Sequence, residues 1–124
     1  MKSILLLVPF LFLTLGIEQC PTPVNEGTHA WIAVESQTSS IKITAQCLNG
    51  APQDRLLSYE LKVEKEGKTG TSSTFQKGSV LVPSRKIISL SQVGLSVSPD
   101  DCYWVRLRVY EGEKFVDEDS LSYP

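Results

Sequence analysis

The amino-acid sequence predicts an all-β protein, an antiparallel β-sandwich of seven to eight strands. Three observations support this fold class. Apolar and polar residues alternate in many short segments, and a period of two places side chains on opposite faces of a strand. Gly, Pro, Asn and Asp residues separate these segments at roughly even spacing, as in β-sandwiches. No segment repeats apolar residues with the period of a helix. A small barrel is the competing arrangement.

The N-terminus has the features of a secretory signal peptide. A lysine precedes an apolar run at residues 4–15, and small residues follow up to Gly16. The run is too short to span a bilayer comfortably, and no second apolar stretch follows it. We expect residues 1–16 to be removed on export, which leaves a protein with no membrane attachment. A lipoprotein signal ending before Cys20 is a minor alternative, because the residues before it are large and polar.

The first two strands follow an irregular leader. Residues 17–28 contain Pro and Gly and show no alternation, so the predicted sandwich domain comprises residues 29–124. Strands are expected at residues 30–35 and 41–47, where alternation is clear. The Asn-Gly-Ala-Pro sequence at residues 49–52 then predicts a turn.

The most regular strand lies in the middle of the chain, and a hairpin follows it. Its apolar side predicts a core face made by Leu57, Tyr59, Leu61 and Val63. Gly67 and Gly70 bracket a Lys-Thr pair, which predicts a tight reversal. The returning segment is small and hydroxylated apart from Phe75, so it suits an exposed strand that could meet another β-chain. A simply solvated hairpin is the plainer interpretation.

The remaining strands are shorter, and turn signals separate them. They are expected at residues 79–82, 87–90, 93–97, 102–110 and 114–121. Pro83 would stop the first of these strands, because proline cannot donate to a β-ladder. Gly94 could mark a β-bulge. The Glu-Gly-Glu sequence at residues 111–113 predicts the last hairpin turn.

Three cysteines in an exported protein leave one thiol without a partner if the others pair. They are Cys20, Cys47 and Cys102, and an oxidising compartment favours pairing. A Cys47–Cys102 disulfide would join an early strand to a late one. Alternation does not clearly support it, because Cys47 continues an apolar face whereas Cys102 opposes one. Cys20 could reach either residue, so the pairing stays open.

The residues that enzymes use are sparse in this chain. His29 is the single histidine, so no Ser-His-Asp or Cys-His set can be built without it. There is no Cys-x-x-Cys motif and no glycine-rich phosphate loop. The carboxylates at residues 117–119 suit a solvated strand end, because neighbouring residues on a strand point to opposite faces. We expect no enzyme activity, metal or cofactor. A pI of about 5.4 argues against nucleic-acid binding.

One strand face combines aromatic and cationic side chains. Opposite the core face of the 102–110 strand lie Trp104, Arg106, Arg108 and Tyr110. The corresponding face of the long strand carries Glu60, Lys62 and Glu64. A cross-strand charge ladder explains this pattern. A docking face explains it equally well, because Trp, Tyr and Arg are the side chains that most often anchor interfaces.

The hairpin also carries the sequence pattern Tyr-x-Leu…Gly-x-x-Gly-x-Ser-Ser…Gln-x-Gly. It is made by residues 58–63, 65–73, 76 and 78–79, with further similarity at residues 88–91, 98–100 and 103. This pattern resembles the curli assembly inhibitor family of bacteria, the CsgH and CsgC proteins, over roughly residues 30 to 120. One branch of that family has a Cys-x-Cys pair, which this chain lacks, so the CsgH-like branch is the nearer one.

The resemblance implies an immunoglobulin-like sandwich in the periplasm. Separately, the run of alternating segments predicts a monomeric domain. The resemblance also implies a chaperone-like protein that transiently binds the amyloid-forming major curli subunit and prevents its premature polymerisation. It supplies no strict motif, so the expected client-binding residues come from the surface pattern: Lys62, Lys65, Lys68, Trp104, Arg106 and Arg108. A periplasmic thiol-disulfide domain and a structural pilus or adhesin module are the alternative functions.

Overall fold

Seven antiparallel strands make up the fold. The computed structural model describes residues 27–68 and 70–124, so the expected signal peptide and Cys20 lie outside the described residues. The strands are β1 (Thr28–Ser36), β2 (Ser40–Asn49), β3 (Arg55–Gly67), β4 (Gly70–Val82), β5 (Ile87–Ser96), β6 (Cys102–Glu111) and β7 (Lys114–Tyr123). The described part of the chain contains no helix long and apolar enough to cross a membrane.

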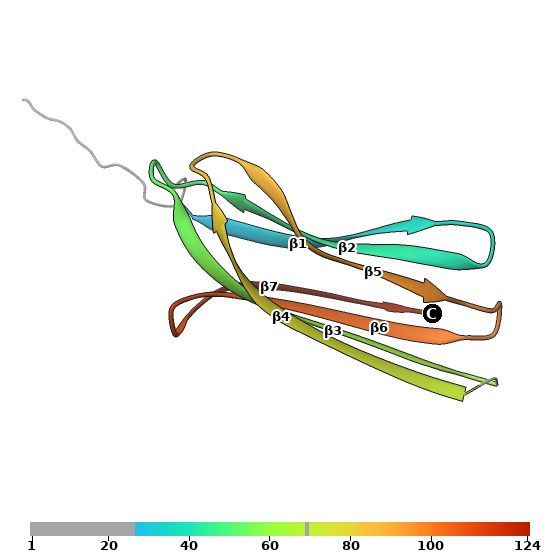
Figure 1. Ribbon diagram of the computed structural model, residues 1–124. Coiled ribbons are helices and arrows are strands. Elements are labelled where there is room, and N and C mark those ends of the chain that lie inside the picture. Colours follow the sequence, from blue (N-terminus) through green and yellow to red (C-terminus); the bar gives the residue numbers. More distant parts are fainter. Residues whose placement is uncertain (1–26, 69) are drawn as a thin grey trace, which may run out of the picture.

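The strands form two sheets that face each other. One sheet has the order β1-β2-β5 and the other β4-β3-β6-β7, and Figure 1 shows them as two layers. This is an immunoglobulin-like sandwich, as expected, and not a barrel. The strands β3 and β6 lie at the centre of the four-stranded sheet, so the faces of these two strands decide which side chains reach the core and which reach solvent.

The core lies between the sheets and follows the predicted alternation. Leu57, Leu61 and Val63 of β3 are buried, and Tyr59 packs against them. The inward residues of β6 and β2 meet them, with Leu107 and Ile43 fully buried. Burying one such side chain contributes about 1.5–3 kcal/mol before conformational entropy is counted.

The hairpin β3–β4 is longer and more regular than predicted. Its register runs without a break from Gly67 opposite Gly70 to Arg55 opposite Val82, so the expectation of a separate strand at residues 79–82 is wrong. Within this strand the Tyr59 side chain packs closely over Gly78, because a Cβ there would lie 3.1 Å from the Tyr59 hydroxyl and 3.2–3.3 Å from its ring. The small residue lets the aromatic side chain lie against β4.

The expected pair of strands at residues 87–97 is also one strand, β5. Its bulge lies at Leu90 and not at Gly94. Ala45 pairs with Ser91 and Gln46 with Ser89, which leaves Leu90 without a partner on β2. A bulge of this kind bends the strand, and Leu90 uses it to turn into the core. The sequence could not show the position of this bulge. A break in the alternation of apolar and polar residues indicates that a strand contains an extra residue, but it does not identify that residue.

Buried polar groups fix both ends of the sandwich. At one end the amide of Asn49 donates to the carbonyls of Gln53 and Val82, and its Oδ1 accepts from the backbone of Ala51. At the other end Asp101, which is 3% exposed, accepts from the backbone of Ser98 at 2.8 Å. Both side chains satisfy backbone groups that loops would otherwise leave unpaired.

One open side of the sandwich is closed by two carboxylates. The Oδ2 atoms of Asp117 and Asp119 on β7 accept hydrogen bonds from the backbone amides of Ala30 and Ile32 on β1, at 2.8 and 2.9 Å. These amides lie on the edge of the three-stranded sheet. The carboxylates expected at a solvated strand end therefore connect the two sheets.

Candidate functional site

The predicted row of aromatic and cationic side chains lies on one surface of the four-stranded sheet. We call it the outer face. The central pairs across β3 and β6 are Glu60 opposite Arg108, Lys62 opposite Arg106 and Glu64 opposite Trp104. All six side chains lie opposite the buried residues of their strands, as expected from alternation.

Two cations contact the Trp104 ring. Lys62 Nζ lies 5.9 Å and Arg106 Cζ 5.4 Å from the ring centroid, within the range of cation–π attraction. Like charges directly opposite each other on two strands normally destabilise a sheet, and Lys62 and Arg106 are such a pair. The attraction of both cations to the indole ring offsets part of that repulsion.

The cations of the outer face differ in how far they are neutralised. Arg108 Nε lies 3.2 Å from Glu118 Oε1 on β7, and this hydrogen bond raises the pKa of Arg108 above its usual range. Lys62 Nζ lies 3.7 Å from Glu64 Oε2. Among the ion pairs of the described residues none includes Arg106. Among the outer-face cations of β3 and β6, its positive charge is therefore the one most available to a partner.

The expectation that Lys65 projects from the same side as Lys62 is wrong. Lys65 is an odd number of residues away, so alternation turns it toward the core side at the end of the sandwich. Its side chain is only 15% exposed; Nζ donates to the Ser96 carbonyl at 2.9 Å and lies 3.7 Å from Asp101 Oδ2. Lys65 joins the two sheets and belongs to the scaffold.

Lys68 lies in the β3–β4 turn and is separate from the outer face. Its side chain is 85% exposed, and Nζ lies 3.3 Å from Asp100 Oδ2 in the neighbouring loop. Exposed ion pairs of this kind contribute little to stability. The structure therefore brings Lys62, Trp104, Arg106 and Arg108 together, places Lys68 at the tip of the sheet, and removes Lys65 from the set.

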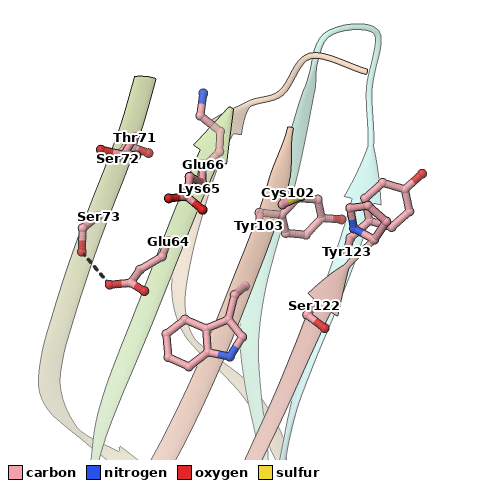
Figure 2. Close-up of a pocket in the computed structure, with 12 residues that line it drawn as sticks. Glu64, Lys65, Glu66, Thr71, Ser72, Ser73, Cys102, Tyr103, Ser122 and Tyr123 are labelled. Carbon is pink, nitrogen blue, oxygen red and sulfur yellow. Dashed lines mark hydrogen bonds between the residues drawn. The ribbon is translucent and has the colours of Figure 1, made fainter. Parts of the chain in front are cut away.

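A hollow of about 510 Å³ opens beside the outer face. Its lining residues are Glu64, Lys65, Glu66, Thr71, Ser72, Ser73, Cys102, Tyr103, Trp104, Ser122, Tyr123 and Pro124. Figure 2 shows Ser73 hydrogen-bonded to Glu64 on one side and Tyr103 near Tyr123 on the other. The two tyrosine rings stack with centroids 5.5 Å apart. No sequence pattern predicted this hollow, because the ends of four strands form it.

The candidate Cys47–Cys102 disulfide is wrong. Both thiols are free in the structure; Cys47 is buried in the core and Cys102 is exposed. Burial, with a smaller contribution from the Asp117 carboxylate, raises the pKa of Cys47 from 9.0 to about 11. A thiol that stays protonated is a poor nucleophile. Cys47 on β2 is buried between the sheets, whereas Cys102 on β6 is exposed, so the pair cannot act as a dithiol.

No metal site is evident in the part of the chain that the structure describes, where no three His, Cys, Asp or Glu side chains cluster. His29 lies exposed on β1.

Comparison with known proteins places the fold. No protein-family model matches the chain, and no curated protein matches it in sequence. Among solved structures it is similar to R. palustris CsgH, with 23% identity and a TM-score of 0.61 over 76% of this chain and 90% of that one. It is also similar to the E. coli curli protein CsgC, with 22% identity and a TM-score of 0.63 over 79% of this chain and 99% of that one.

A third similarity is to a β-glucuronidase of Bacteroides uniformis. The identity is 12% and the TM-score 0.55, over 77% of this chain but only 14% of the enzyme. The sandwich is therefore shared with one small part of a much larger protein. At these identities the likenesses show a common fold, and CsgH and CsgC share it over nearly their whole length.

Proposed function

We propose that this protein has a curli-related role as a periplasmic, chaperone-like inhibitor. It would bind the amyloid-forming major curli subunit transiently and prevent its premature polymerisation. The sandwich shared with CsgH and the curli protein CsgC over most of all three chains supports this proposal. The observation that carries it in this chain is the outer face, where Arg106 lies over Trp104 and no described carboxylate pairs with it.

The physical mechanism needs only weak and fast binding. Amyloid grows when chains add to exposed strand edges, so an inhibitor must meet the client before a fibril end does. Unpaired cations attract an acidic or amide-rich chain over several ångströms and raise the encounter rate more than the final affinity. Trp104 then offers a flat apolar surface for short-lived contact.

The decisive experiment is fibril growth of purified curli major subunit, followed by dye fluorescence with and without this protein. We expect a longer lag at substoichiometric protein. An unchanged lag at equimolar, correctly folded protein would reject the proposed function.

Two charge reversals locate the site. Arg106→Glu should shorten the lag toward that of the client alone. Lys86→Glu is the matched control, because Lys86 is exposed in the turn before β5, outside every strand of the described residues. Both variants change the net charge equally. If they delay fibrils equally well, net charge acts and the outer face is not the site.

A further inference from the structure

The sandwich has four edge strands, β1, β5, β4 and β7, and three of them are protected against pairing. Carboxylates of β7 bond the edge amides of Ala30 and Ile32 on β1. The β7 strand is held against β1 by these same hydrogen bonds, and its pairing with β6 has a register shift at Val109 and Tyr110. The β5 strand is interrupted by its bulge at Leu90. Turned carboxylates and bulges are known devices against edge pairing.

The fourth edge, β4, has none of these devices. It is 13 residues long, pairs with β3 without a register shift, and contains no proline and one charged residue, Lys77. Phe75 and Leu81 are 56% and 58% exposed on its outer side, and Leu81 lies opposite Leu56, which is 60% exposed. A long, regular edge with exposed apolar side chains is the kind that accepts another strand.

The hairpin geometry shows which backbone groups are free. A two-residue loop closes on a hydrogen-bonded pair, here Gly67 and Gly70, and such pairs recur at every second residue. The amides and carbonyls that point away from β3 are therefore those of Thr71, Ser73, Phe75, Lys77, Ser79 and Leu81. The same residues carry the outward side chains of β4. A strand added here gains backbone hydrogen bonds and side-chain contacts at the same positions.

We propose that the β4 edge binds an extended segment of the amyloid-forming client by strand addition. This inference rests on the proposed function and names its binding mode. Lys77 takes part in no ion pair among the described residues, and Phe75 lies two residues from it on the same face. An antiparallel segment would therefore present an acidic or amide residue to Lys77, and an apolar residue two positions later to Phe75.

Charge selects a client over a second copy of this chain. The β4 strand has no Asp or Glu, so another β4 cannot supply a carboxylate to Lys77. Pairing of two copies would also bring the cations of two outer faces close together, and these charges would repel each other. An acidic or amide-rich strand meets neither obstacle.

The test uses a blocked peptide, Val-Thr-Thr-Thr-Glu-Thr-Phe-Thr-Thr, which matches the outward positions of β4 from Leu81 to Ser73. It is titrated into isotope-labelled protein while backbone amide resonances are recorded. We expect the largest shifts at the outward amides of β4 and small shifts on β6. Shifts concentrated on β6, or none at millimolar peptide, would overturn the inference.

Variants of the edge sharpen the result. Ser73→Pro removes one outward amide donor and should raise the peptide Kd about threefold to tenfold, whereas Ser73→Ala keeps the amide and should leave Kd nearly unchanged. Lys77→Glu should leave the domain folded, because the side chain is exposed, although it places a second carboxylate opposite Glu60 on β3. It should weaken binding of the Glu peptide and strengthen binding of the same peptide carrying Lys in place of Glu. Failure of this exchange contradicts the proposed register.

Two further outcomes separate this inference from the proposed function. Peptide binding at β4 by a protein that does not delay curli fibrils would support the edge and reject the function. Delay of fibrils without peptide binding at β4 would support the proposed function and reject the β4 edge as the binding site. A dimer in sedimentation that Ser73→Pro dissociates would show that a second copy occupies the edge, which overturns the choice of client.

Discussion

Gly67 shows how one missing side chain fixes the end of the sandwich. A Cβ built there overlaps Asp101 Oδ1, and Asp101 is buried while it accepts from Ser98 and lies 3.7 Å from Lys65. The loop before β6 can pack against the β3–β4 hairpin only because position 67 has no side chain.

The first prediction follows from that contact. Gly67→Ala should destabilise the domain by about 1–3 kcal/mol, as overpacking usually does, because Asp101 must move away from its partners. Urea denaturation measures the change. Gly94→Ala is the control, since nothing lies within 4 Å of its added Cβ. Equal stability of the two variants would contradict the packing described.

The two described thiols should differ sharply in reactivity. In a Cys20→Ser background, Cys102 should react with a thiol reagent in the folded protein, because it is exposed. Cys47 should react only after unfolding, because it is buried and its pKa is raised to about 11. Rapid labelling of both thiols in the native protein would contradict the structure.

The raised pKa of Cys47 also makes stability depend on pH. The unfolded thiol loses its proton above about pH 9.0, while the folded one keeps it until about pH 11. Between these values the unfolded state binds fewer protons, so the free energy of unfolding falls as pH rises, by up to about 1.4 kcal/mol per pH unit. Below pH 9 this contribution is fully present.

Denaturation of the parent and of Cys47→Ala, at pH 8, 9, 10 and 11, isolates the effect. The difference between the two proteins should shrink as pH rises, because the variant lacks the titrating thiol while other groups titrate alike in both. A constant difference over this range would mean that Cys47 is less desolvated than its position indicates.

At the scale of strands, the β1–β7 side depends on two carboxylates. Asp119→Ala removes the acceptor of the Ile32 amide and should cost about 1–2 kcal/mol of unfolding free energy. The Ile32 amide should then exchange its hydrogen faster. Ser122→Ala, at an exposed position of the same strand, should change neither quantity. Unchanged exchange at Ile32 in Asp119→Ala would show that the hydrogen bond is not formed in solution.

Sequence alternation predicted the strands and their faces well, because the period of two is a local property. It correctly placed Leu61 and Leu107 in the core and Lys62 and Arg106 on the surface. It failed where distant strands decide the outcome. The bulge at Leu90 depends on pairing with β2. Alternation does place Lys65 on the core side, but its partner there, Asp101, lies in a loop more than thirty residues away.

The candidate site could be predicted only in part, for the same reason. The row of aromatic and cationic residues was visible in the sequence. The pairing of Arg108 with Glu118, which leaves Arg106 available, required the β6–β7 register. From the sequence β4 could be predicted only as an exposed, hydroxylated strand. Whether a strand lies at the edge of a sheet depends on the strand order, which the sequence pattern does not show.

For the whole molecule, salt should separate the two modes of contact. The Debye length is about 8 Å at physiological ionic strength and about 3 Å at 1 M. The attraction by Arg106 and its neighbours should therefore fade as salt rises, while backbone hydrogen bonds at β4 persist. We expect the fibril delay to fall with salt to a residual value, and we expect Ser73→Pro to reduce this residual delay further. A delay independent of salt would mean that charge plays no part in the encounter.

The strand order has a consequence for how quickly the chain acquires its structure. Three pairings, β1–β2, β3–β4 and β6–β7, join strands that are neighbours in the sequence, whereas β2–β5 and β3–β6 close long loops. Local hairpins form in microseconds, but sandwiches rich in non-local pairing fold in milliseconds to seconds. The long β3–β4 hairpin can therefore be complete before β6 arrives. During that interval both of its edges are open, so the newly made chain is itself most exposed to mispairing before its central contact forms.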